Sequence, residues 1–353
     1  MEQTHSQKNT FVNSDTQGDF HKLHFDSIQT LRGIAAIFVV FEHIRFLQNG
    51  AFGVDLFFCI SGFMIMFTTY KDTKHFLRKR LLRILPFYYA MTIATYFLLL
   101  VFPSMFEQSS ANLSYLAKSL LFIPFDIGNG AIQPLLRIGW TINMEMFFYL
   151  LFFLASHISH KYRGLLCSLF LGAFVLLGKV FLGANVVLSF YSNPIILEFV
   201  MGMLCYEIAR KIYNYHRKQK GSPFLIPVLS LLSLFLVIFM WQIRPLVSMS
   251  GFNRLLYWGI PALLILLCFF TLGLLTTMPK FTVTLGNISF SLYLIHYYPV
   301  MFIDRKILDF SIVTPISVLG AICSILIIIL AAKFAWYLIE HKLGTWLRVQ
   351  LKV

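Results

Sequence analysis

An arginine and a histidine lie eleven positions apart in the first strongly apolar segment of the chain. Arg32 and His43 belong to the run LRGIAAIFVVFEHIRF. Eleven residues of an α-helix make three full turns plus roughly 20°, so both side chains project from one face, about 16 Å apart along the axis. An arginine at the centre of a membrane helix costs about 2.5–3.5 kcal/mol and usually faces a bundle interior, where it marks a functional site. The structural alternative is an arginine that reaches the lipid headgroups beside a buried histidine.

His43 has the chemistry of a general acid and base. A histidine that titrates near neutral pH can take a proton from a hydroxyl and return it to a leaving group. The adjacent Glu42 points about 100° away on a helix, so it does not share this face directly.

A basic block, KHFLRKRLLRILPFYY, opens the third apolar segment. Arg80 and Arg83 are three residues apart and lie on one helix face, and Lys79 is their neighbour. Arginine makes bidentate contacts with phosphate. The block is therefore interpreted either as a cradle for an anionic cofactor or as a positively charged anchor on the inner side of the membrane.

Three carboxylates are expected inside or at the edge of other apolar segments. Asp55 stands at the outer end of GVDLFFCISGFMI, which also places Ser61 near its middle. Glu145 follows Trp140 in WTINMEMFFY, and Glu198 occurs at a similar depth in NPIILEFVMGMLCYE. A carboxylate buried in lipid needs a partner or a proton. Glu145 and Glu198 are predicted either to serve a site or to tie two helices together. Asp55 is predicted either to serve a site or to occupy a solvated helix N-terminal position.

The run LGNISFSLYLIHYYPV interleaves hydroxyl side chains with a second histidine. Ser289, Ser291 and Tyr293 can hydrogen-bond across helices. His296 is interpreted as a residue that supports the base or the structure, and not as the base itself. The chain contains no GxSxG elbow, P-loop, GxGxxG or HExxH pattern. Their absence argues against soluble-type hydrolase, nucleotide-hydrolysing, dinucleotide and zinc-protease chemistry.

The composition is that of a polytopic membrane protein. Of the 353 residues, 58% are hydrophobic and 12% are charged, against about 25% charged residues in soluble domains. The net charge of +14 lies in short blocks between apolar segments, which indicates orientation in a lipid bilayer and not nucleic-acid binding. The five cysteines fall in apolar stretches without paired spacing, so neither a disulfide framework nor a metal site is expected.

Ten apolar segments are long enough to cross about 30 Å of hydrocarbon. With both chain ends in the cytoplasm, 19 of the 29 Lys and Arg residues fall on the inner side and seven on the outer side, as the positive-inside rule requires. This orientation places Arg32 near the inner edge and His43 beyond the bilayer centre. The segments are 28–47, 52–70, 84–102, 139–157, 164–183, 194–210, 223–242, 255–276, 284–302 and 312–336.

The predicted fold is thus an all-α integral membrane protein with about ten transmembrane helices. Residues 1–26 are predicted as a polar cytoplasmic tail, 27–340 as the transmembrane domain and 341–353 as a cytoplasmic C-terminal tail. The connection 103–138 is predicted to hold an interfacial helix and a loop.

From about residue 27 onward, the sequence resembles the acyltransferase-3 family of integral membrane acyltransferases. The resemblance rests on LRGIAAIFVVFEH with its Arg-x10-His spacing, GVDLFFCISGFMI, FLRKRLLRILPFYY, WTINMEMFFY and GNISFSLYLIHYYPV. It implies a bacterial inner-membrane enzyme that moves an acyl group, usually acetyl, from cytoplasmic acyl-CoA to an extracytoplasmic carbohydrate. The run around Glu198 looks closest to members that modify exopolysaccharides and surface glycans. Some relatives continue into a hydrolase-like domain, which is not expected here.

The resemblance also implies roles for individual residues. It carries Arg32 and His43 over as the essential pair, and Arg80 and Arg83 as contacts to the donor, acetyl-CoA. His43 would deprotonate a hydroxyl of a surface polysaccharide or lipid-linked glycan, or form an acetyl-histidine intermediate. No metal is expected, and the acceptor sugar and the oligomeric state stay open. Lys79 is expected to join Arg80 and Arg83 at the donor phosphates, and Arg32 to line the entrance for the donor. Residues expected to tune or support this chemistry are Glu42, Glu145, Asp55, Ser61, Trp140, Glu198 and His296.

A secondary transporter or flippase for a saccharide or lipid-linked saccharide is the alternative function. Ionisable residues inside a membrane also build proton relays and substrate paths. Transporters often show repeated halves and paired interrupted helices, and neither is evident in this sequence. The enzyme is therefore the preferred interpretation.

Overall fold

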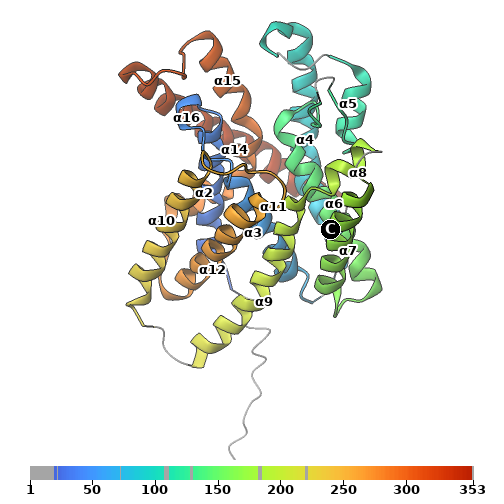
Figure 1. Cartoon of the computed structure of the whole chain (residues 1–353), viewed down its shortest axis with the longest axis vertical. Helices are drawn as coiled ribbons and strands as arrows, with labels where there is room; N and C mark the ends of the chain where they lie inside the picture. The colour runs from blue at the N-terminus through green and yellow to red at the C-terminus, as the bar shows by residue number, and fades with distance from the viewer. Residues whose placement is uncertain are drawn as a thin grey trace, which may run out of the picture.

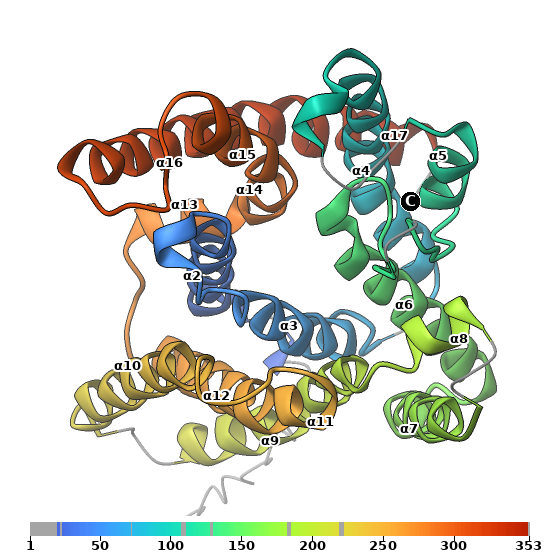
Figure 2. The same cartoon turned by 45° about the horizontal axis from the view of Figure 1, so that its top comes forward.

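The computed structural model is all-helical and describes residues 20–21, 23–71, 73–106, 111–127, 130–181, 185–218 and 222–351. In this part of the chain no strand forms, and the one β-type pairing is an isolated bridge between Asp126 and Ile132. Helices α2 (Asp26–Glu42) and α3 (Gly53–Thr68) lie near the middle of the bundle, and the other helices surround them (Figures 1 and 2).

Among the described residues, each predicted apolar segment is mostly helical. The long helices are α4 (Phe76–Val101), α6 (Trp140–Ile158), α7 (Arg163–Phe181), α9 (Leu197–Lys218), α10 (Leu225–Ile243), α12 (Ile260–Leu275) and α16 (Pro315–Ala335). The shorter helices are α5 (Leu113–Leu120), α8 (Val186–Tyr191), α11 (Gly251–Arg254), α13 (Lys280–Asn287), α14 (Ser289–Ile295), α15 (Tyr297–Lys306) and α17 (Gly344–Gln350). Two π-helical stretches, Leu255–Gly259 and Trp336–Leu343, join α11 to α12 and α16 to α17. Helix α5 lies in the connection predicted to hold an interfacial helix.

Five of the described helical segments are long and apolar enough to cross a membrane. Large apolar side chains such as Leu231, Leu234 and Phe235 of α10 are exposed on the outside of the bundle, which is the arrangement expected where helices face lipid tails. The chain is therefore described as a multi-pass membrane protein, and ten crossings remain a prediction. The five segments are Phe76–Val101, Arg137–Ile158, Leu225–Ile243, Gly251–Leu275 and Pro315–Gln350.

The ninth apolar segment is interrupted in the structure. Helices α13, α14 and α15 follow one another with breaks at Ile288 and His296. The His296 ring Nδ1 lies 2.7 Å from the Tyr293 carbonyl oxygen. In a continuous α-helix this carbonyl would accept the backbone N–H of Tyr297. The side chain of His296 therefore competes for the bond that would carry the helix through this point.

Two glycines set the close approach of α3 and α9. A Cβ atom on Gly62 would lie 2.1 Å from the Phe199 carbonyl oxygen, and one on Gly202 would lie 2.0 Å from the Cys59 carbonyl oxygen. Any larger residue would force the two backbones apart. The packing fixes α3, and with it Ser61, against the rest of the bundle.

The chain enters the bundle just before α2. Phe20 is fully buried, and its ring centroid lies 5.8 Å from Phe67, 5.9 Å from Tyr206 and 6.0 Å from Phe270. The other residues of the predicted tail up to residue 19 lie outside the described residues. The predicted limits of the tails and of the transmembrane domain stay predictions.

Candidate active site

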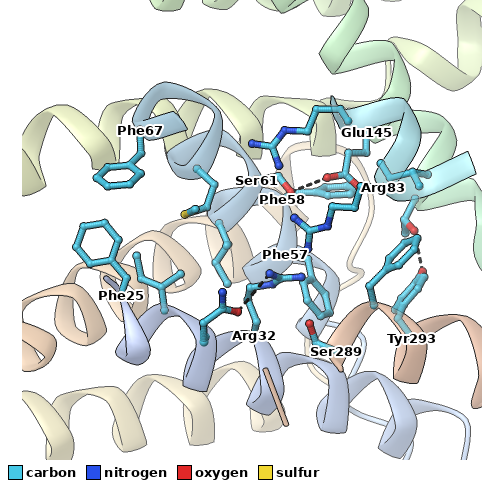
Figure 3. Close-up of a pocket in the computed structure, with 18 of the residues that line it drawn as sticks. Phe25, Arg32, Phe57, Phe58, Ser61, Phe67, Arg83, Glu145, Ser289 and Tyr293 are labelled. Carbon is cyan, nitrogen blue, oxygen red and sulfur yellow. Dashed lines mark hydrogen bonds between the residues drawn. The ribbon is translucent and has the colours of Figure 1, made fainter. Parts of the chain in front are cut away.

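A cavity of about 260 Å³ lies among α2, α3, α4, α6 and α14. Its lining includes five of the residues predicted from the sequence: Arg32, Ser61, Arg80, Arg83 and Glu145. The Arg32 and Arg83 side chains point into the same space, with Ser61 and Glu145 next to them (Figure 3). Charged and polar residues separated by more than a hundred positions in the sequence thus line one cavity inside an apolar helix bundle.

Two hydroxyl groups hold the carboxylate of Glu145 in place at the wall of the cavity. Glu145 Oε1 accepts hydrogen bonds from the Ser61 hydroxyl at 2.8 Å and from the Tyr149 hydroxyl. The guanidinium of Arg80 lies 5.5 Å from the centroid of the Tyr149 ring, where a cation is attracted to the aromatic face. Arg80 also donates to the Thr68 hydroxyl at 2.9 Å. These contacts position both charges at the wall of the cavity.

The cavity lining carries more positive than negative charge. Three guanidinium groups face one carboxylate, because Arg32, Arg80 and Arg83 line it with Glu145. A second carboxylate, Glu340 of the π-helical stretch, acts electrostatically on Arg32 and Arg83 and accepts a hydrogen bond from Ser291. Even with both carboxylates ionised, one positive charge remains, which favours an anionic ligand.

A basic groove of about 720 Å³ adjoins the cavity. Phe67, Arg80 and Arg83 line both spaces. The groove also contains Lys79, the remaining residue predicted from the basic block. Its other cationic residues are Lys71, Lys74 and Arg348. Cationic side chains thus extend from the groove to the wall of the cavity, an arrangement suited to a ligand with phosphate groups at one end.

His43 and His296 are in contact at the far end of α2. His43 Nδ1 lies 2.9 Å from the Val39 carbonyl oxygen and 3.3 Å from His296 Nε2. His296 Nδ1 lies 2.7 Å from the Tyr293 carbonyl oxygen. The sequence predicted both histidines as site residues but gave no sign that they touch, because 253 positions separate them.

These contacts determine the proton positions on the neutral rings. A carbonyl oxygen only accepts, so His296 Nδ1 carries the proton and its Nε2 has the lone pair. Both partners of His43 Nδ1 are then acceptors, so this nitrogen carries the proton of His43. The lone pair of His43 is consequently on Nε2, and Nε2 is the atom that can take a proton from another group.

Two predicted carboxylates form ion pairs with arginines that the sequence analysis assigned no role. Glu42 accepts from the guanidinium of Arg244, including a bond of 2.8 Å to Oε1. Asp55 is fully buried and accepts two hydrogen bonds from Arg254, at 3.0 Å and 2.8 Å. The ion pairs thereby tie α2 and α3 to the α10–α11 region, and the predicted contributions of Glu42 and Asp55 to the chemistry stay predictions.

The remaining predicted residues cluster around Arg254. Its guanidinium lies 6.0 Å from the Trp140 ring centroid and 5.0 Å from that of Trp258. Glu198 is fully buried, and its charge acts on Arg254. Within the described residues, neither Glu198 carboxylate oxygen has a hydrogen-bond partner. In the same part of the chain, no group of three His, Cys, Asp or Glu side chains is arranged to hold a metal ion.

Comparisons with known proteins give a family and two relatives. A family profile described as an acyltransferase domain matches residues 25–334. The exopolysaccharide production protein ExoZ of Rhizobium meliloti is 35% identical over 163 residues, which cover 45% of this chain and 50% of ExoZ. The O-acetyltransferase OatA of Staphylococcus aureus is 27% identical over 179 residues, which cover 44% of this chain and 29% of OatA. The matches thus span half of one relative and less than a third of the other. No solved structure matches significantly.

Proposed function

This chain belongs to the acyltransferase-3 family of acyltransferases, and from that premise we propose that it transfers an acetyl group from acetyl-CoA to a hydroxyl of a saccharide. The observation that carries the proposal is the cavity with Arg32, Arg80 and Arg83, which shares its Arg80 and Arg83 walls with the basic groove. The names of the two relatives, one an O-acetyltransferase and the other an exopolysaccharide production protein, support acetyl transfer and a carbohydrate acceptor.

The donor would bind with its phosphates in the basic groove and its acyl end in the cavity. Coenzyme A carries its phosphates at the nucleotide end, and the arginines and lysines of the groove match that charge. The cavity of about 260 Å³ has aromatic walls that include Phe57 and Phe58. It admits the narrow pantetheine arm but not the bulky nucleotide, which favours a small acyl group at its inner end.

His43 Nε2 would act as the general base. A sugar hydroxyl attacks the thioester carbonyl carbon, and its proton passes to His43 Nε2. The carbon–sulfur bond then breaks, and the thiolate takes the proton from His43 to give free CoA. Transient acetylation of the same nitrogen is the alternative route. The Nδ1–H bond to the Val39 carbonyl supports this role because it keeps the lone pair on Nε2.

The membrane topology forms part of this proposal. Ten crossings with both ends in the cytoplasm of a bacterial inner membrane would put the basic groove on the side where acetyl-CoA is made. The acceptor, a surface polysaccharide or lipid-linked glycan, would approach His43 from the other side.

Cysteine labelling tests the topology. Single cysteines at positions 74 and 218, in a chain without its five native cysteines, are expected to react with a membrane-impermeant maleimide only after the cells are opened. The Lys and Arg of both loops hold them inside. Labelling of either position in intact cells would refute the orientation.

Radiolabelled acetyl-CoA tests the activity. Purified protein in lipid vesicles is expected to transfer the acetyl label to glycan from the producing bacterium, with release of one free CoA thiol per acetyl group. A transporter or flippase would move the glycan without modifying it. Glycan movement with no acetyl transfer would therefore favour that second function and reject the first.

A further inference from the structure

Two hydroxyl groups form part of the cavity wall beside the histidine pair. Thr141 Oγ1 of α6 lies 2.7 Å from the Tyr293 hydroxyl of α14, and both residues line the cavity. The Tyr293 side chain is seen at the cavity in Figure 3. The backbone carbonyl of Tyr293 accepts the His296 Nδ1–H, and His296 contacts His43. One residue thus connects the cavity to the base.

The two hydroxyls share one backbone acceptor. The Ile138 carbonyl lies 2.9 Å from the Tyr293 hydroxyl and 3.2 Å from Thr141 Oγ1. Each hydroxyl carries one proton, and the acceptors within reach are this carbonyl, which has two lone pairs, and the oxygen of the partner hydroxyl. The oxygen of a bound thioester carbonyl can take their place as the acceptor of both protons.

A third hydroxyl independently indicates a ligand. Ser289 is fully buried and lines the cavity, yet its Oγ has no hydrogen-bond partner among the described residues. A buried polar atom left unpaired is destabilising, and a ligand atom that bonds to it recovers the loss. Ser289 and Tyr293 are four residues apart and lie on one face of α14. The pantetheine arm of an acyl-CoA has its first amide N–H four bonds beyond the thioester carbonyl carbon, so a donor bound in this cavity offers both a carbonyl oxygen and an N–H.

We propose that the hydroxyls of Thr141 and Tyr293 are the oxyanion donors of the reaction, and that Ser289 accepts the first amide N–H of the donor arm. The proposal rests on the proposed acyl transfer. When the sugar oxygen bonds to the thioester carbon, the carbonyl oxygen gains a negative charge, which the two O–H groups stabilise. Cleavage of the carbon–sulfur bond restores the carbonyl. Tyr293 is linked to His43 through His296, so the hydroxyl pair and the base belong to one connected group of side chains.

Two substitutions test the oxyanion donors in purified protein. Tyr293→Phe is expected to lower kcat about 10²–10³-fold, the loss typical of one oxyanion donor, with the Kd for acetyl-CoA within about twofold. Thr141→Val is expected to lower kcat in the same direction, and Thr141→Ser to restore most of it. The double variant is expected to lose little more than Tyr293→Phe alone, because both hydroxyls serve one oxygen atom.

A matched pair outside the cavity controls for packing. Thr95 Oγ1 and the Tyr298 hydroxyl also lie 2.7 Å apart and neither residue lines the cavity. Tyr298→Phe is expected to leave kcat unchanged.

Ser289→Ala gives the complementary readout, a roughly tenfold weaker binding of acetyl-CoA with kcat unchanged. Normal kcat in Tyr293→Phe, or a loss confined to Kd, would overturn the oxyanion assignment. A wild-type protein that binds acetyl-CoA but transfers no acetyl group would instead reject the proposed function.

Discussion

Replacing His43 with alanine is expected to reduce acyl transfer about 10²–10⁴-fold or more, the contribution of a positioned general base. The Kd for acetyl-CoA is expected to stay within about twofold, because His43 is not among the residues that line the cavity. The base acts only in its neutral form, so the wild-type rate is expected to fall as the pH is lowered and the imidazole is protonated. Steady-state kinetics across pH and donor titration measure both quantities.

His157 provides a matched control. Its Nδ1 lies 2.9 Å from the carbonyl oxygen four residues earlier, the same local contact that His43 makes. His157 is exposed and contributes to neither the cavity nor the basic groove. His157→Ala is expected to leave transfer unchanged. Substantial turnover in His43→Ala at normal protein levels would contradict the mechanism.

The helical fold could be predicted from the sequence because apolar segments of this length have few other stable forms in a membrane. The number of helices that cross the membrane could not be predicted from the sequence in the same way. Helix α3 is apolar but short, and the ninth segment divides at Ile288 and His296. A histidine side chain that competes for a backbone carbonyl depends on its rotamer, which periodicity does not reveal.

Arg32 and Glu145 could be predicted because each carries a costly charge into an apolar segment. Arg83 could be predicted because it shares one helix face with Arg80 in a basic block, and the three residues lie together. Partners distant in sequence could not be assigned. The pairing of Asp55 with Arg254 spans 199 positions, and no spacing rule predicts it.

Two further residues of the candidate site had no clear signal in the sequence. Thr141 is an ordinary residue inside WTINMEMFFY, and its proximity to Tyr293 depends on how α6 packs against α14. Glu340 lies after the last apolar segment, where a carboxylate is unremarkable, and only the packing of the π-helical stretch brings it near Arg32 and Arg83. The contribution of such residues to the site can be recognised only from the three-dimensional structure.

Removing the two arginines that line both cavity and groove is expected to produce the second large effect. Arg80→Ala and Arg83→Ala are each expected to weaken acetyl-CoA binding about 10–100-fold, because a hydrogen bond to a charged group contributes about 1.5–3 kcal/mol. Arg80→Lys is expected to recover only part of this loss, since a lysine offers a point charge in place of a planar fork. Binding to purified protein is measured by titration at two salt concentrations, because partly exposed charge pairs weaken as salt rises.

Arg78 separates ligand binding from membrane orientation. It belongs to the same basic block and is exposed, but it lines neither the cavity nor the basic groove. As an orienting charge it equals Arg80, so the anchor hypothesis predicts the same mild effect for both residues. The cradle hypothesis predicts normal donor binding in Arg78→Ala and a large loss in Arg80→Ala. Unchanged binding in the Arg80→Ala/Arg83→Ala double variant would assign the block to orientation alone, because no positive charge from α4 would then be needed to hold the donor phosphates.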